Sequence, residues 1–125
     1  AADMFLVPVS LDHLAVVGAT DALATAASLT AAGHDSRFLG ILPTMWERQT
    51  KESDEQFRFL AGQFGQWVWP PIPRDTKVRE ASAHGQTLWE YDPPCRAITG
   101  VHIDGKPVGG YAQALNRLVD ALKAR

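Results

Sequence analysis

The stretch Met4-Phe5-Leu6-Val7-Pro8-Val9 is apolar without interruption. A strand that is apolar on both faces is typical of a parallel sheet with helices packed on each side. The apolar spacing that follows predicts a helix over residues 14–31, with Asp12 as its N-cap. Residues 37–42 are a second apolar strand, which we expect Pro43 to end.

The alternation of strands and helices continues to the end of the chain. Thr50 or Ser53 can cap a further helix, whose apolar spacing runs to residue 64. A short strand is expected at 67–69. A short helix at 76–83 and an extended piece at 87–91 come next. The last helix covers 109–123, and its apolar spacing predicts these inward-facing side chains: Tyr111, Leu115, Leu118, Val119 and Leu122. The pattern predicts one α/β domain over 1–125 with a mostly parallel sheet, which we interpret as a fragment of a three-layer α/β/α sandwich.

Composition sets the class of the protein. The chain has 125 residues, of which 46% are hydrophobic and 21% are charged, values that are ordinary for one globular domain and exclude a disordered chain. No apolar run approaches the roughly 18 residues of a membrane span. A single cysteine excludes an internal disulfide and favours a reducing compartment. With a net charge of -2, contact with a polyanion depends on local basic clusters such as Arg74-Lys77-Arg79.

A phosphate-loop pattern is almost complete near the C-terminus. Residues 100–106 match the first seven positions of G-x-x-x-x-G-K-[ST], but Pro107 stands at the eighth and supplies neither a hydroxyl nor an N–H group. The favoured interpretation is a hairpin, with Asp104-Gly105 as the turn between 101–103 and 106–108.

Metal and nucleophile chemistry have little support. The four histidines have no ligand spacing, and only one cysteine is present, so we expect no metal site and name no catalytic residue. A Cys95–His nucleophile pair stays open, although a packing role is favoured for a lone cysteine.

Three stretches, in this order, carry a resemblance to a known family. They are Leu6-Val7-Pro8-Val9, Gly40-Ile41-Leu42-Pro43-Thr44-Met45 and Ile72-Pro73-Arg74-Asp75-Thr76-Lys77-Val78-Arg79-Glu80-Ala81-Ser82-Ala83-His84-Gly85-Gln86-Thr87-Leu88. Together they resemble the C-terminal half of ParA-type partition ATPases, which are deviant-Walker P-loop ATPases that segregate chromosomes and plasmids. The third stretch is the most specific, because it resembles the family block I-P-R-N-x-x-x-x-E-A-x-x-x-G. Residues 99–108 resemble an insertion relative to the family.

The resemblance implies a nucleotide site. In this family the loops after two late strands hold adenine, and the matching positions are Thr44, Met45, Pro73, Arg74 and Asp75. The complete parent uses ATP and Mg²⁺. The family's Walker A loop and Walker B strand have no match in this sequence, either because it is a fragment or because it is a natural truncation. The parent hydrolyses ATP, but we expect this chain alone to be inactive and to hold no cofactor tightly.

The resemblance also implies partners. The family binds DNA without sequence specificity, and the matching or adjacent basic residues are Arg48, Lys77 and Arg79, whereas Gln49 stands where an arginine is common. A homodimer, a ParB-like partner protein and a cytoplasmic, nucleoid-associated location are implied, with no membrane contact. Two alternatives stay open: a fragment of a MinD-like positioning ATPase that binds membrane through the last helix, and a non-catalytic interaction module derived from the family.

Overall fold

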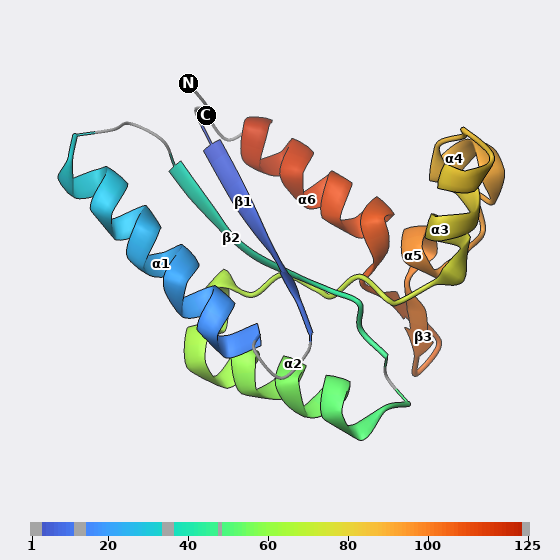
Figure 1. Ribbon diagram of the computed structural model, residues 1–125, viewed down its shortest axis with the longest axis horizontal. Helices are drawn as coiled ribbons and strands as arrows, with labels where there is room; N and C mark the ends of the chain where they lie inside the picture. The colour runs from blue at the N-terminus through green and yellow to red at the C-terminus, as the bar shows by residue number, and fades with distance from the viewer. Residues whose placement is uncertain (1–3, 12–14, 34–36, 48, 124–125) are drawn as a thin grey trace.

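The computed structural model describes residues 4–11, 15–33, 37–47 and 49–123 (Figure 1). The elements are β1 (Met4–Ser10), α1 (Ala15–Ala31), β2 (Arg37–Thr44), α2 (Lys51–Phe64), the 3-10 turn η1 (Gly65–Trp67), α3 (Thr76–Ala83), α4 (Leu88–Tyr91), α5 (Arg96–Thr99), β3 (Val101–Ile103), β4 (Lys106–Val108) and α6 (Gly110–Lys123). The predicted cap Asp12 lies outside the described residues.

Parallel pairing of β1 and β2 forms the centre of the molecule. The register runs from Met4 opposite Arg37 to Ser10 opposite Thr44, with one irregularity between Phe5 and Leu6. Two isolated parallel bridges add the segment after α2 to this arrangement. Ile41 of β2 bridges to Val68, and Trp46, just after β2, bridges to Pro73. The mostly parallel sheet is therefore confirmed.

Helices cover both faces of the strand pair, as Figure 1 shows. Successive strand residues point to opposite faces, and β2 shows this directly. Ile41 packs in one apolar cluster with Ala19 of α1 and Leu60 of α2. Its neighbour Leu42 packs in a second cluster with Ala114 of α6. The three-layer α/β/α arrangement predicted from the sequence is confirmed.

Proline does not end β2, contrary to the sequence prediction. The strand continues through Pro43 to Thr44. Proline lacks only the donor, and the carbonyl oxygen of Pro43 still accepts a hydrogen bond from the Ile72 N–H at 2.8 Å. This extension places the end of β2 next to residue 72.

Two predicted extended pieces have a different structure. Residues 67–69 contain the end of η1 and only a single bridge, at Val68. Residues 87–91 were wrongly predicted as extended, because Thr87 and Glu90 form a capping box that starts α4. The Glu90 carboxylate accepts the Thr87 N–H at 2.9 Å, and this hydrogen bond lowers the pKa of Glu90.

Only part of the predicted inward face of α6 is buried. Tyr111 and Leu118 pack with Ala114 against the sheet, as the helical spacing predicts. Three other predicted core residues are exposed on the neighbouring stripe: Leu115, Val119 and Leu122. Val17 of α1 is exposed as well. The apolar arc of each helix is wider than the part of the sheet that it covers.

The predicted hairpin at 101–108 is confirmed and has a tightly packed base. β3 and β4 pair antiparallel, with Asp104 and Gly105 in the turn. Gly109 has a φ of 78°, and a Cβ there would overlap the carbonyl oxygen of Pro71. The Gly110 N–H donates to that same oxygen at 3.1 Å. Close backbone approach therefore fixes the hairpin and the start of α6 to residue 71.

Candidate functional site

The carboxyl ends of β1 and β2 lie together, because Ser10 pairs with Thr44. The loop after β2 is joined to residues 72–74 by two backbone hydrogen bonds. The Trp46 N–H donates to the carbonyl oxygen of Ile72 at 3.0 Å, and the Arg74 N–H donates to the carbonyl oxygen of Trp46 at 2.8 Å. Two segments that the sequence singled out are thus brought side by side at the edge of the sheet where α/β proteins bind ligands.

Two cavities open at this edge. The larger, of about 700 Å³, is lined by the loop after β2, the segment before α3, and α5 with the start of the hairpin. Its side chains include Trp46, Glu47, Gln49, Pro73, Arg74, Thr76, Arg96 and His102. The smaller, of about 410 Å³, is lined by residues that include Ser10, Leu11, Met45, Glu47, Thr50 and Arg74. Both volumes are in the range of small-molecule sites.

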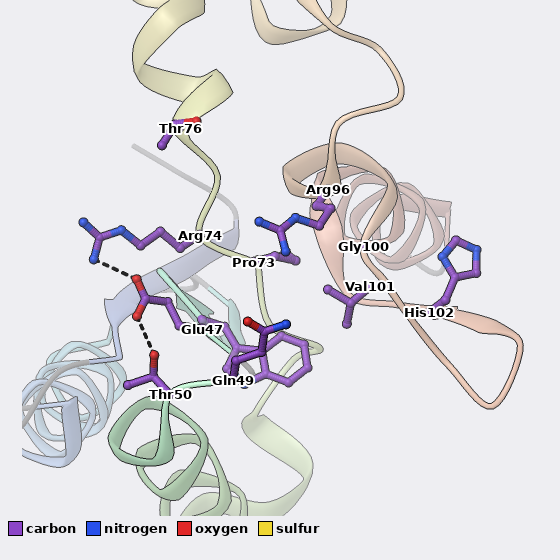
Figure 2. A pocket seen from close by; sticks show the side chains of 11 residues that line it. Glu47, Gln49, Thr50, Pro73, Arg74, Thr76, Arg96, Gly100, Val101 and His102 are labelled. Carbon is purple, nitrogen blue, oxygen red and sulfur yellow. Dashed lines mark hydrogen bonds and ion pairs between the residues drawn. The ribbon is translucent and has the colours of Figure 1, made fainter.

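A salt bridge contributes to both cavities. Arg74 Nη1 lies 3.0 Å from Glu47 Oε1, and the Thr50 hydroxyl donates to Glu47 Oε2 at 2.8 Å (Figure 2). The Glu47 N–H donates to the Oγ of buried Ser53 at 2.9 Å. These contacts fix the loop and neutralise the charges of Glu47 and Arg74.

The predicted adenine residues divide between the cavities. Pro73 is buried and lines the larger cavity, Met45 is exposed and lines the smaller, and Arg74 lines both. Met45 has a φ of 58°, a conformation that non-glycine residues seldom adopt. Thr44 lies at the end of β2 and lines neither cavity.

Asp75 joins two helices. Its Oδ1 accepts the Lys77 N–H at 3.0 Å as the N-cap of α3, and its Oδ2 accepts the Ala97 N–H of α5 at 3.3 Å. Asp75 lines neither cavity, so a ligand contact there would use the remaining lone pairs of a carboxylate that already holds α3 against α5.

Two of the three basic residues predicted to bind DNA, Lys77 and Arg79, lie on α3. Lys77 Nζ is 3.1 Å from Glu80 Oε2, and this hydrogen bond and charge raise the pKa of Lys77. Arg79 is exposed. Arg48 lies outside the described residues, and its neighbour Gln49 lines the larger cavity.

Sequence reasoning did not assign Arg96 and His102 to the site. Arg96 lies on α5 and His102 on β3, and these two consecutive elements form part of the wall of the larger cavity. No sequence pattern predicted α5. α5 is only four residues long and has no detectable apolar period. Its capping residue, Cys95, is buried, and burial raises the pKa of the thiol. A protonated thiol is a poor nucleophile, so a packing role is favoured.

The described part of the chain contains no cluster of three histidine, cysteine, aspartate or glutamate side chains placed to hold a metal ion. No helix within the described residues is long and apolar enough to cross a membrane.

Comparison with known proteins adds to this geometry. No family model matches the chain. Over 95 residues it is 34% identical to the chromosome-partitioning ATPase Soj of Thermus thermophilus, an overlap that covers 74% of this chain and 38% of the relative. Soj of Treponema pallidum is 30% identical over 97 residues, which cover 76% of this chain and 38% of the relative. The chain is a homologue of ParA-type ATPases.

Solved ParA-type structures have the same fold. The ATP complex of a single-substitution variant of the Cyanothece protein McdA superimposes with a TM-score of 0.64 at 23% identity, covering 75% of this chain and 38% of that chain. Apo McdA gives a TM-score of 0.64 at 23% identity, covering 75% of this chain and 40% of that chain. This chain therefore spans about two fifths of the length of the ParA-type proteins that it matches.

Proposed function

We propose that the chain is part of a ParA-type ATPase that acts in chromosome or plasmid partitioning, and that it supplies adenine-binding and non-specific DNA-binding surfaces. The observation that carries this proposal is the joining of the loop after β2 to Pro73 and Arg74 at the carboxyl ends of parallel strands. The likeness to Soj, itself named a chromosome-partitioning ATPase, supports the process.

Adenine is the part of the nucleotide that this chain is equipped to bind. The part of Pro73 that lines the larger cavity offers an apolar surface to a flat ring, and the ion pair of Arg74 and Glu47 borders it. McdA, which shares the fold, has been solved as an ATP complex, and this supports ATP as the nucleotide. The triphosphate and Mg²⁺ need a phosphate loop, and residues 100–107 form a hairpin instead. We therefore assign ATP hydrolysis to the complete ParA-type protein and expect this chain alone to be inactive.

DNA binding is assigned to α3. Lys77 and Arg79 place positive charge next to Arg74, and lysine and arginine both suit contact with phosphate. A homodimer, a ParB-like partner and a nucleoid-associated location in the cytoplasm complete the proposal. All three rest on the likeness to ParA-type proteins.

If Lys77 and Arg79 form the DNA-binding surface, the affinity for DNA should depend on their charges and fall with rising salt concentration. The double substitution Lys77→Ala with Arg79→Ala removes both charges. We expect it to abolish most of the binding to a short DNA duplex of arbitrary sequence. Fluorescence anisotropy measures this, and with about three phosphate contacts the slope of log K against log salt should be near -3 for the unchanged chain. The matched control removes two charges elsewhere, Arg58→Ala with Lys123→Ala, and should leave the slope unchanged. Equal affinity for the α3 variant and the control would exclude α3 from the interface.

One observation favours the MinD-like alternative. The exposed apolar residues of α6, Leu115, Val119 and Leu122, lie on a helix that also carries Arg117 and Lys123. Co-sedimentation with anionic lipid vesicles separates the two functions. The partition ATPase proposal expects the chain to stay in the supernatant, and vesicle binding lost in Leu115→Ser with Leu122→Ser would favour the alternative.

A further inference from the structure

The larger cavity contains polar groups that the partition ATPase resemblance does not explain. Glu47 and Arg74 neutralise each other, and Thr50 is hydrogen-bonded to Glu47. Within the described part of the chain, by contrast, Gln49 and Arg96 have no hydrogen bond or ion pair through their side chains. The cavity therefore offers one free amide and one free guanidinium group.

These two groups approach the same space. Figure 2 shows the Arg96 side chain reaching toward Pro73, while the amide of Gln49 points into the cavity from the loop after β2. The ring of His102 is turned away from Gln49 in the same view, so His102 is not part of this arrangement. Pro73, in contrast to the two polar side chains, is buried and fixed by the bridge with Trp46.

We propose that Gln49 determines the base specificity of the site by pairing with the edge of adenine, and that Arg96 covers the face of the ring opposite Pro73. This inference rests on the proposed adenine site. It gives Gln49 a base contact at the position where the family commonly carries an arginine.

At the base edge that carries N7 and the group on C6, the chemistry of the amide selects adenine over guanine. A glutamine amide offers an acceptor beside a donor, and adenine presents the complementary pair: the N6 amino donor beside the N7 acceptor. Guanine presents two acceptors, O6 and N7, at the corresponding edge, so the amide oxygen of Gln49 would have no donor to meet. A planar guanidinium stacks on any base, so Arg96 strengthens binding without discriminating between them.

Saturation-transfer NMR titrations of the unchanged chain with adenosine and with guanosine test the inference. We expect adenosine to bind on the order of tenfold more tightly. Gln49→Ala should bring the two nucleosides to equal affinity, whereas Arg96→Ala should weaken both by the same factor and keep the preference. Gln66→Ala, an exposed glutamine outside this cavity, is the matched control and should change neither value.

The outcomes separate this inference from the proposed function. A preference for adenosine that survives in Gln49→Ala, or equal binding of both nucleosides by the unchanged chain, overturns the role of Gln49 and leaves the adenine site standing. Absence of binding of either nucleoside at millimolar concentration overturns the adenine site, and the role of Gln49 with it.

Discussion

Gly109→Ala is expected to destabilise the chain by about 3–5 kcal/mol, because two costs add. The added Cβ would overlap the carbonyl oxygen of Pro71, which belongs to rigid backbone and accepts the Gly110 N–H. A φ of 78° would also force an L side chain into the left-handed region. Relief of the overlap must move the start of α6 away from residue 71 and loosen the packing of Ala114 on the sheet.

Gly105→Ala is the matched control for this effect. Its φ is also 78°, but a Cβ there meets nothing within 4 Å, because the residue lies at the hairpin turn. Only the backbone cost of about 1–2 kcal/mol remains. Urea unfolding followed by circular dichroism compares the two variants, and loss of a cooperative transition in Gly109→Ala counts as the larger effect. Equal midpoints for the two variants would show that the contact with Pro71 is not tight.

Leu60→Ala is expected to lower the free energy of unfolding by about 3 kcal/mol. Leu60 has no exposed surface and packs in the cluster that contains Ile41 and Trp46. Truncation leaves a void between α2 and the sheet. The same unfolding measurement applies.

The neighbouring Phe59 tests whether this cost reflects burial. Phe59 is 53% exposed, so Phe59→Ala removes a larger side chain from the same helix at a cost of about 1 kcal/mol or less. If Phe59→Ala were the more damaging of the two, the orientation of α2 on the sheet would be wrong.

Periodicity predicted the fold well where one pattern dominates. The continuous apolar run of β1 and the helical spacing of α2 and α6 are strong signals, and they were enough for the layered α/β arrangement. The failures came from short segments governed by local chemistry. The capping box of Thr87 and Glu90 turned an expected extended piece into α4, and Pro43 remained in β2 because only its donor is missing.

The candidate site was predictable in part. Pro73 and Arg74 were found from the family block, because that block is continuous in the sequence. The place of Arg96 in the site depends on how α5 folds back on residues 71–75. Three-dimensional contacts such as that of Asp75 with Ala97 bring these segments together, and no local spacing records them.

The exposed stripe of α6 shows a different limit of sequence reasoning. Leu115, Val119 and Leu122 share their helical period with Tyr111 and Leu118, so the pattern alone assigns all five to the core. Only the position of the sheet decides which stripe is covered. A helix whose apolar arc exceeds its contact surface leaves such residues for another surface to cover.

The most direct test of the adenine site is a map of amide chemical shifts during titration of the isotope-labelled chain with adenosine. The proposal predicts that the largest changes lie at Trp46, Glu47, Gln49, Arg74 and Thr76, which border the larger cavity. A third cavity, of about 460 Å³, is lined by Trp67, Trp69 and Arg117 among others, and serves as an internal reference that should not respond. Changes centred on that cavity, or no change at millimolar adenosine, would contradict an adenine site at the carboxyl ends of β1 and β2.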